Sequence, residues 1–344
     1  MKAYTLPPGA GISALKLVNL PTPVPSAGEV LVQTHAASLN YRDLMYARGD
    51  YINLKDEPLV PLGDGAGQVV AVGPRVTRFK PGDRVIHSYF PGWIDGVPDP
   101  EKTAVSFGTH INGALAESFI APESALVSIP THLSYAEAAT LSCAGTTAWN
   151  ALFIDGDLKP GATVLLQGTG GVSIIALQLA KAAGLRVIIT SSSDDKLARS
   201  RELGADAVIN YTNIPEWQQE VRRLTHGRGV DLTVEVGGAG TLRRSIEATR
   251  MGGIVAVIGG LVGFGDTVIE PIALIRNIVR LSGILVGSRS MLEDLCRFVS
   301  ATGIRPIIDR EFPFASAPLA YEHLKAGRHF GKVIVRVERD TDTA

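Results

Sequence analysis

A short glycine cluster at residues 168–173, with the sequence GTGGVS, has residue types and spacing that suit phosphate binding. It follows the apolar run 163–167 and opens a segment whose apolar residues recur at helical spacing. Strand, glycine turn and helix in this order are typical of proteins that hold a dinucleotide diphosphate, because two glycines let the backbone turn tightly and approach the phosphates. The helix N-terminus then offers free N–H groups. We expect the diphosphate to lie against Gly168, Gly170, Gly171 and Val172.

One position of the fingerprint departs from the usual pattern. Ser173 stands where the third glycine of G-x-G-x-x-G packs helix against strand. A turn that uses glycine only for its geometry is therefore the alternative interpretation. The strand before the cluster and the helix after it, within a longer alternation of strands and helices, favour the cofactor site.

The end of the next predicted strand indicates which dinucleotide would bind. NAD sites place an acidic residue there, whereas this chain has Ser191, Ser192 and Ser193, followed by Lys196. Hydroxyl groups and a cation suit a 2′-phosphate, so the sequence predicts NADPH rather than NADH. A solvated helix face is the alternative explanation for Lys196.

The elements that must position this site fall into two classes along the chain. The first 125 or so residues hold short β-like runs between proline and glycine turns, which predicts a small, partly closed barrel. After a helical segment with a capping box at Ser134 and Glu137, strands alternate with helices, which predicts a doubly wound parallel sheet. The predicted strands are 29–39, 66–73, 83–90, 113–121, 163–167, 186–190, 206–210, 231–236, 253–259, 283–287 and a closing strand within 329–337.

Bulk composition excludes several classes of function. The chain has 344 residues, a formal net charge of −1 and only two cysteines, Cys143 and Cys296. This balance gives no support to nucleic-acid binding, a disulfide framework or a four-cysteine zinc site. No apolar run is suited to a signal peptide or a membrane span, so we expect a cytoplasmic protein that acts on a small molecule.

Several motifs in a fixed order resemble those of the medium-chain dehydrogenase/reductase superfamily, over essentially the whole chain. They are AGEVLVQTHAASLNYRDL (27–44), PLGDGAGQVVAVG (61–73), RFKPGDRV (78–85), GTTAWNAL (145–152), LLQGTGGVS (165–173), LGADAVINY (203–211) and GKVIV (331–335). The chain looks most similar to the zinc-free quinone-oxidoreductase-like branch. The resemblance implies an α/β protein with a GroES-like, mostly-β catalytic domain, residues 1–125 completed by 298–344. It also implies a Rossmann NADP-binding domain, residues 126–297, and a homodimer paired through an edge strand such as 283–287.

Departures from the zinc-dependent relatives bear on the chemistry. Asn40 stands where those relatives place a cysteine ligand, and Gly63-Asp64 stands where they place His-Glu. A catalytic zinc site normally needs three protein ligands, so no metal is expected. Conjugated acceptors suit a zinc-free site because hydride addition gives a delocalised anion, while aliphatic alcohols are hard to deprotonate without a metal.

The resemblance also implies roles for individual residues. Tyr51, Asn40 and Asp64 are the candidate catalytic groups, with a loop aromatic and a turn residue as the alternatives for Tyr51 and Asp64. Phe90 and Trp93, in the long loop 88–113, are expected to shape an apolar substrate pocket, with a satellite aromatic cluster as the alternative. The remaining cofactor contacts implied are Thr147, Tyr211, Ile258, Gly259, Gly287, Ser288, Arg289 and Lys332.

Taken together, the sequence predicts an NADPH-dependent oxidoreductase that transfers hydride to a quinone or an α,β-unsaturated carbonyl without zinc. Two alternatives remain open. One is a metal-free alcohol or aldehyde dehydrogenase, and the other is a non-catalytic NADPH-binding protein.

Overall fold

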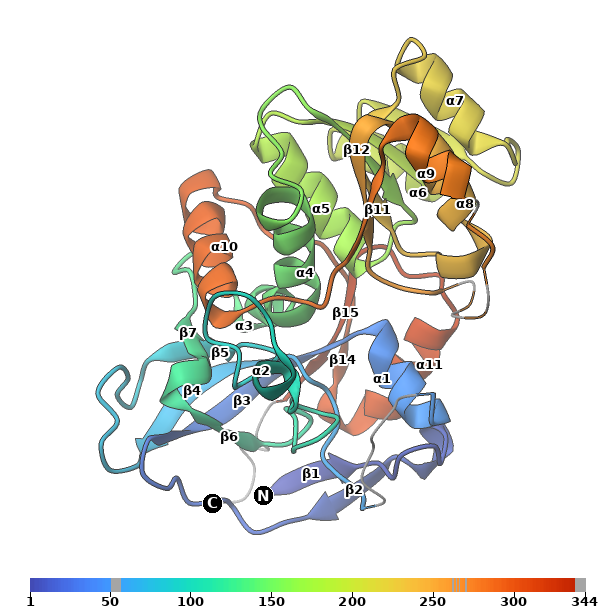
Figure 1. Ribbon diagram of the computed structural model, residues 1–344. Coiled ribbons are helices and arrows are strands. Elements are labelled where there is room, and N and C mark those ends of the chain that lie inside the picture. Colours follow the sequence, from blue (N-terminus) through green and yellow to red (C-terminus); the bar gives the residue numbers. More distant parts are fainter. Residues whose placement is uncertain (51–56, 262, 264, 266, 270, 338–344) are drawn as a thin grey trace. The chain divides into compact units, whose positions relative to one another are not determined.

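A seven-stranded mixed sheet and a six-stranded parallel sheet organise two separate units of the chain (Figure 1). The computed structural model describes residues 1–50, 57–261, 263, 265, 267–269 and 271–337. Unit 1 comprises Met1–Thr146 and Gly287–Ala344, and unit 2 comprises Thr147–Val286. The domain limits expected at 125/126 and 297/298 remain a prediction. The mostly-β unit and the parallel-sheet unit confirm the predicted fold class.

Unit 1 is built around one long strand, β3 (Glu29–Leu39). On one side β3 pairs with β4 along most of its length, and on the other it pairs with β6 through its first half and with β15 through its second. The sheet order is β14-β15-β3-β4-β5-β7, with β6 attached to β3. The strands of this unit are β1 (Lys2–Thr5), β2 (Lys16–Asn19), β3, β4 (Gly65–Val72), β5 (Arg84–His87), β6 (Ser118–Pro122), β7 (Leu126–Ser128), β14 (Ile308–Pro313) and β15 (Lys332–Arg336).

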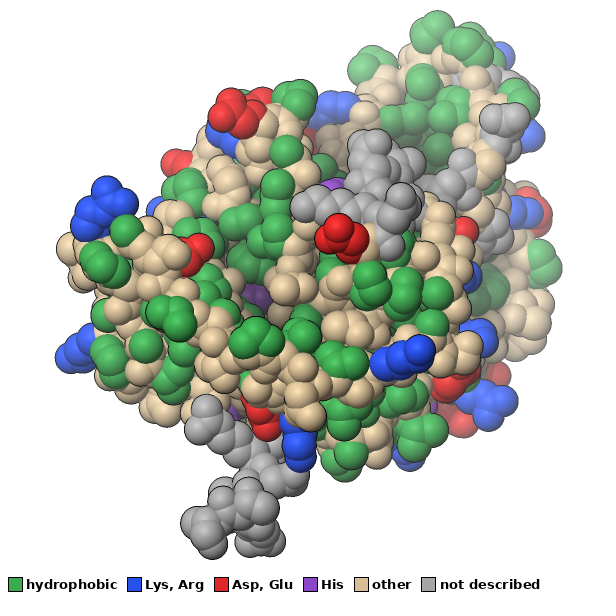
Figure 2. Space-filling view, turned by 90° about the horizontal axis from the view of Figure 1, so that it is seen from below, with side chains coloured by type: hydrophobic (Ala, Val, Ile, Leu, Met, Phe, Trp, Pro, Cys, Tyr) green, Lys and Arg blue, Asp and Glu red, His purple; other side chains and the backbone are tan. Residues whose placement is uncertain are grey.

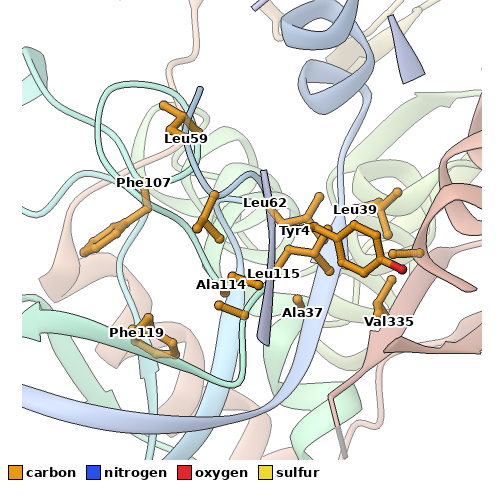
Figure 3. Packing of buried hydrophobic residues seen from close by; sticks show 14 of the residues in the cluster. Tyr4, Ala37, Leu39, Leu59, Leu62, Phe107, Ala114, Leu115, Phe119 and Val335 are labelled. Carbon is orange, nitrogen blue, oxygen red and sulfur yellow. The ribbon is translucent and has the colours of Figure 1, made fainter. Parts of the chain in front are cut away.

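The closing strand returns to the N-terminal sheet, where it pairs antiparallel with β3 and parallel with β14 (Figure 1). Its residues Val333 and Val335 are fully buried and belong to the same apolar cluster as Tyr4 and Leu39. Figure 3 shows Tyr4, Leu39 and Val335 close together in this cluster. The core of unit 1 therefore joins the two ends of the chain, since burial of apolar area is the main force that holds distant segments together.

The helices of unit 1 flank this sheet. They are α1 (Tyr41–Arg48), α2 (Pro100–Thr103), α3 (Tyr135–Ala139), α10 (Arg289–Thr302) and α11 (Ala317–Lys325). The capping box predicted at the start of α3 is confirmed, because the Glu137 carboxylate accepts from the Ser134 N–H at 2.7 Å and Ser134 Oγ accepts from the Glu137 N–H at 3.2 Å. The short helix α4 (Thr146–Trp149) lies between two π-helical turns, Leu141–Gly145 and Asn150–Ile154.

Unit 2 holds a parallel sheet in the order β10-β9-β8-β11-β12-β13. The chain fills one half of the sheet from β8 to β10 and then fills the other half from β11 to β13. Right-handed crossovers therefore carry the helices to both faces of the sheet. The elements are β8 (Thr163–Gln167), α5 (Gly171–Ala182), β9 (Arg186–Ser191), α6 (Asp194–Glu202), β10 (Ala207–Asn210), α7 (Trp217–Leu224), β11 (Val230–Glu235), α8 (Leu242–Ala248), β12 (Thr249–Val257), α9 (Pro271–Asn277) and β13 (Arg280–Gly283).

Four predicted strands differ from the structure by three residues or more at one end. The strand expected at 83–90 is β5, which ends at His87, and the strand expected at 253–259 is β12, which already begins at Thr249. The strand expected at 113–121 begins only at Ser118, because residues 113–115 donate their N–H groups to the carbonyls of residues 60–62 outside any regular strand. The strand expected at 283–287 is β13, which ends at Gly283. Val286 has a φ of 51° and cannot continue an extended strand, while Arg280 stands in register with Ile254 of β12.

The surface carries charges of both signs. On the face seen in Figure 2, basic and acidic side chains are scattered among apolar and neutral ones and do not gather into one patch. This distribution agrees with the near-zero net charge and gives no support to a nucleic-acid surface on this face. None of the helices in the described ranges combines the length and apolar character needed to cross a bilayer.

Candidate functional site

Three segments from distant parts of the sequence meet at one point of the unit 1 sheet. Ala37 of β3 stands opposite Gly65 of β4, so the residue that follows β3 and the residue that precedes β4 are neighbours. Leu39 stands opposite Val333 of β15, which brings the first residue of β15 to the same place. Strand register alone therefore gathers Asn40, Asp64 and Lys332.

A buried ammonium group joins these three side chains. Lys332 Nζ donates to the carbonyl of Leu39 at 2.6 Å and to Asn40 Oδ1 at 2.5 Å. Asn40 Nδ2 in turn donates to Asp64 Oδ2 at 2.8 Å, and Lys332 Nζ lies 3.8 Å from the same carboxylate oxygen. Lys332 is 2% exposed and Asp64 is fully buried, so the ion pair is shielded from water. Two predicted catalytic residues and one predicted cofactor residue thus form one cluster.

The Asp64 carboxylate is poised to change its protonation state near neutral pH. Burial raises its pKa to about 6, against the lowering influence of Lys332 and Asn40. Its second oxygen, Oδ1, has no hydrogen-bond partner among the described residues. Asp64 is therefore a buried carboxyl group with one free oxygen, which is the chemistry required of a group that takes or releases a proton.

A second carboxylate and a second cation lie next to this cluster. Asp43 is 2% exposed and accepts a hydrogen bond from the Asn40 N–H at 2.7 Å, which caps α1. Burial raises the pKa of Asp43, and the guanidinium of Arg42 opposes this effect. Arg42 also lies over the ring of Tyr89, with 4.4 Å from Cζ to the ring centroid, and donates to Thr109 Oγ1. Each buried carboxylate thus has a cation beside it: Arg42 for Asp43 and Lys332 for Asp64.

Gly63 has no room for a side chain. A Cβ atom at this position would lie 2.7 Å from the Phe107 carbonyl oxygen, 2.9 Å from Arg42 Nη1 and 2.9 Å from Tyr89 Cε2. Contacts below 3 Å with backbone cannot be relieved by rotating a side chain. The space that a histidine ligand would need at this position is filled by other parts of unit 1.

Two further titratable groups lie near the cluster and stay uncharged at pH 7. Burial lowers the pKa of His87 to about 4, and its Nδ1 lies 3.0 Å from the Ser88 carbonyl oxygen, so the hydrogen belongs on Nδ1. Burial raises the pKa of Cys143 to about 12, with Asp64 adding to the effect. Over the ranges that the structure describes, no group of three His, Cys, Asp or Glu residues has the arrangement of a metal site.

Phe90 and Trp93 lie in a buried aromatic cluster of unit 1. They are 4% and 2% exposed, and their ring centroids are 6.3 Å apart. Trp93 Nε1 donates to the Gly96 carbonyl at 2.9 Å, and the Trp93 carbonyl accepts from the Arg289 N–H at the start of α10. The loop is therefore held by a bond within itself and by a bond to the start of α10. The expected contribution of Phe90 and Trp93 to a substrate pocket stays a prediction.

In unit 2 the glycine cluster forms the predicted turn between β8 and α5. Gly168 has a φ of +69°, a backbone conformation that residues other than glycine rarely adopt. A Cβ atom at this position would meet nothing within 4 Å. Gly170 is the N-cap of α5, whose first residues Gly171 and Val172 are partly exposed. A tight turn with open space above it, followed by a helix N-terminus, fits a dinucleotide diphosphate.

The serine in place of the third glycine has a structural role. Ser173 is 2% exposed, and its Oγ donates to the carbonyl of Gln167 at 2.6 Å. The hydroxyl thus joins the first turn of α5 to the last residue of β8. This hydrogen bond bridges the gap between helix and strand that a glycine at this position would allow to close by direct packing.

The end of β9 carries the groups expected to face the adenosine ribose. Ser192 is exposed, while Ser191 is buried and its Oγ accepts from the Ser193 N–H at 3.3 Å. Asp194, the first acidic residue after β9, accepts a hydrogen bond from Asn210 Nδ2 at 2.7 Å. Tyr211 follows β10 and is 43% exposed. Lys196 lies in the first turn of α6, where its N–H donates to Ser193 Oγ at 3.4 Å.

The other predicted cofactor residues are divided between the units. In unit 2, Thr147 is 3% exposed on α4, while Ile258 and Gly259 directly follow β12. In unit 1, Gly287, Ser288 and Arg289 open α10, where Ser288 caps the helix by accepting from the Met291 N–H at 3.2 Å. Tyr51 lies outside the described residues, so its catalytic role stays a prediction.

Sequence reasoning missed three elements of these sites. Arg42 and His87 gave no signal, because their neighbours come from strands and loops that are distant in sequence. Glu235 did give one, since a charged residue in the apolar run 231–236 must find partners when the strand is buried.

Comparison with known proteins identifies the family. Residues 26–131 match the alcohol dehydrogenase GroES-like domain and residues 171–301 match the zinc-binding dehydrogenase domain. A zinc-type alcohol dehydrogenase-like protein of Schizosaccharomyces pombe is 42% identical over 90% of this chain and 91% of its own length. A putative alcohol dehydrogenase of Sinorhizobium meliloti superposes with a TM-score of 0.90 at 41% identity, covering 98% of this chain and 99% of that one.

More distant solved structures include a quinone oxidoreductase of Pseudomonas syringae, with a TM-score of 0.83, 27% identity, and coverage of 97% of this chain and 99% of that one. A mycobacterial protein solved in complex with NADPH has a TM-score of 0.82 at 27% identity, covering 98% of this chain and 99% of that one. The chain belongs to the medium-chain dehydrogenase/reductase superfamily. It is an NAD(P)-dependent oxidoreductase of the alcohol dehydrogenase and quinone oxidoreductase kind.

The serine of the glycine turn leads to a stability prediction. Ser173→Gly would restore the usual fingerprint, yet we expect it to lower the free energy of unfolding by about 1 to 2 kcal/mol, because the bond to Gln167 is lost and glycine disfavours the helix. Chemical denaturation measures this change. Ser173→Ala, which loses only the hydrogen bond, serves as the control and should lose less. A glycine variant as stable as the parent would show that the hydroxyl has no structural role.

Proposed function

We propose that the chain is an NADPH-dependent oxidoreductase that transfers hydride to a quinone or an α,β-unsaturated carbonyl without zinc. The observation that carries this proposal is the buried contact of the Lys332 ammonium with Asn40 and Asp64, with 2.5 Å from Nζ to Asn40 Oδ1. By the resemblance of the sequence, Asn40 stands where zinc-dependent relatives place a cysteine ligand, and Gly63-Asp64 stands where they place His-Glu. A cation that belongs to the protein already stands there.

Three features argue against a metal at this cluster. Asn40 Oδ1 and Asp64 Oδ2 already take part in hydrogen bonds within the cluster. The Lys332 ammonium lies 3.8 Å from Asp64 Oδ2 and would repel a divalent cation bound to that carboxylate. Repulsion between like charges a few ångströms apart in a buried site costs on the order of several kcal/mol. Gly63 has no room for a histidine. A zinc site would therefore require rebuilding the cluster.

The residues of the cluster suit reduction of a conjugated acceptor. A bound nicotinamide cofactor supplies the hydride. The fixed positive charge of Lys332 favours negative charge that develops nearby, in the way that preorganised donors do in other active sites. Asp64, with its pKa raised to about 6, can carry the proton that completes the reduction. An alcohol substrate would need a stronger base than Asp64, which is why the metal-free alcohol dehydrogenase remains the second choice.

Rapid-mixing kinetics test the reaction. The purified protein should oxidise NADPH with a quinone or an enone and only slowly with a simple aldehyde. Lys332→Met, which keeps the length of the side chain and removes the charge, should lower kcat/KM by roughly 100-fold. Lys325→Met on α11, an exposed side chain that is 62% accessible, is the matched control and should behave like the parent.

Two outcomes would contradict this assignment. Stoichiometric zinc in active protein, measured by elemental analysis, would overturn the zinc-free mechanism. Tight NADPH binding without oxidation by any acceptor would favour the non-catalytic alternative.

The preference for NADPH rests on Ser192 and Lys196. Lys196→Ala should raise the dissociation constant of NADPH about tenfold and leave that of NADH within twofold, because only NADPH carries the 2′-phosphate that the ammonium contacts. Ser192→Asp should act in the same direction. Arg201→Ala, an exposed cation on the same helix, is the control. Equal affinity of the parental protein for both cofactors, measured by fluorescence titration, would remove the basis for this preference.

A homodimer is the proposed assembly, and the predicted cytoplasmic location stays a prediction. β13 lies at the end of the parallel sheet order, and Ile275 and Ile278 next to it are 68% and 67% exposed. An open strand edge beside apolar side chains favours pairing with a second copy. Sedimentation velocity should show a dimer, and Ile275→Asp should shift it to monomer while Leu319→Asp on α11 does not. A monomeric parental protein at micromolar concentration would contradict this assembly.

A further inference from the structure

A buried carboxylate at the end of β11 accepts hydrogen bonds from several different residues. Glu235 is fully buried. Its Oε1 accepts from the Gly237 N–H at 2.7 Å, the Gly238 N–H at 2.9 Å and Thr241 Oγ1 at 2.5 Å. Its Oε2 accepts from Gln167 Nε2 at 2.8 Å and from Ser245 Oγ. With five hydrogen bonds accepted from five different residues, this carboxyl group fixes the position of the groups that donate to it.

Glu235 joins the ends of neighbouring strands at the carboxyl edge of the parallel sheet. Gln167 ends β8 and directly precedes the glycine turn, and its Oε1 accepts from the N–H groups of Val236 and Gly237 at 3.2 and 3.3 Å. The carbonyl of Glu235 accepts from the Ile258 N–H at 2.8 Å, just beyond β12. The strand ends of β8, β11 and β12 are thus connected through one residue and its immediate partners.

The loop after β11 is packed too tightly to move independently. Gly238 has a φ of +81°, and a Cβ there would lie 2.5 Å from the Gly263 carbonyl oxygen. The Ala239 N–H donates to that same oxygen at 3.1 Å, and the Leu261 N–H donates to the Val236 carbonyl at 3.0 Å. The segment that follows β12 therefore takes its position from the loop that Glu235 holds.

The order of the strands assigns the two halves of a dinucleotide to different sides of β8. In a doubly wound sheet the ligand lies outside the carboxyl ends of the strands, at the point where the strand order reverses. Here that point lies between β8 and β11. The serines and Lys196 belong to β9 and the helix after it, which is the adenosine side. The loop that Glu235 holds lies beyond β11, on the other side.

We propose that Glu235 is a positioning residue for the nicotinamide half of the cofactor, acting through the loops after β11 and β12 and through Gln167. The inference rests on the proposed function, since it assumes that a dinucleotide binds. Because the carboxylate engages the N–H groups of Gly237 and Gly238, these groups serve the loop and do not bind phosphate. Among the described residues, the hydrogen-bond partners of the Glu235 carboxylate are Gln167, Gly237, Gly238, Thr241 and Ser245, which do not belong to β9 or α6. Its removal should therefore affect the two halves of the cofactor unequally.

Another buried carboxylate on the same strand offers a matched control. Asp231 lies near the opposite end of β11 and accepts from the Thr163 N–H at 2.8 Å, from Arg228 and from Arg250. Burial would raise its pKa, but these hydrogen bonds outweigh burial and lower it to about 2. Asp231→Asn should therefore reduce stability above pH 4, where the ionised group stabilises the fold, without touching the carboxyl edge of the sheet.

The experiment compares a whole dinucleotide with its adenosine half. Glu235→Gln places an amide nitrogen opposite Gln167 Nε2, so that two donors face each other and the connection to β8 breaks. Calorimetric titration of this variant should give a dissociation constant for NADPH raised roughly tenfold or more, since small displacements of a bound group have effects of this size. The dissociation constant for 2′,5′-ADP should stay within twofold. Asp231→Asn should lower the melting temperature and change the affinity for neither ligand.

Several outcomes separate the possibilities. Equal weakening of NADPH and 2′,5′-ADP by Glu235→Gln, or no weakening of either, would overturn the positioning role while leaving the proposed function intact. A parental protein that binds neither ligand would overturn the proposed function and this inference with it. If Glu235→Gln fails to fold, Ser245→Ala and Thr241→Val each remove one donor to the carboxylate. Each should then weaken NADPH severalfold and spare 2′,5′-ADP, and equal effects on both ligands would overturn the inference.

Discussion

The site in unit 1 depends on the burial of one ammonium group. A lysine that is 2% exposed is tolerated only where its charge is paired and hydrogen-bonded, and Lys332 meets this condition through Leu39, Asn40 and Asp64. The contact of Lys332 with Asn40 and Asp64 requires that the end of β3 and the starts of β4 and β15 lie side by side in the sheet. The register of these strands ensures this. The same constraint explains why Asn40 and Asp64 lie where they do: each is the first residue outside a strand whose partner strand is fixed by core packing. The polar cluster is therefore positioned by the pairing of strands whose apolar side chains form the core of unit 1.

Unit 2 shows a related use of polar side chains beside the backbone. Ser173 joins the helix of the glycine turn to the strand before it, and Glu235 joins three strand ends through a short network. Both side chains are buried and both act on the carboxyl edge of the parallel sheet, where ligands bind in folds of this class. A departure from the glycine fingerprint is therefore compatible with a cofactor turn, because a short side chain that returns a hydrogen bond fills the same interval as close packing.

Local signals predicted some of the regular elements closely, whereas the strands β1, β2, β7 and β14 had no predicted counterpart. The start of α5, the bounds of β3 and β8 and the capping box of α3 follow from glycine, serine and apolar patterns within a few residues. The strand β13 begins three residues before the predicted strand 283–287, because Leu285 and Val286 continue the apolar pattern after the chain has left the extended conformation. The contact of Arg42 with Tyr89, the neutral His87 and the network of Glu235 involve residues separated by many positions. No pattern within a window reports such contacts, although the two acidic residues in the buried run 231–236, Asp231 and Glu235, each require partners.

The pairing of β15 with β3 also has a consequence for how the protein is made. Lys332 reaches Leu39 across 293 positions of the chain, so the N-terminal strands must wait for the last strand before the ion pair can form. Chains are synthesised at about 5 to 20 residues per second, which makes this delay roughly 15 to 60 seconds. Until then the second half of β3 has an open edge and Asp64 lacks its cation. A chain that is cut short before residue 332 lacks both the strand that covers this edge and the cation that pairs with Asp64, so the cluster cannot form in it.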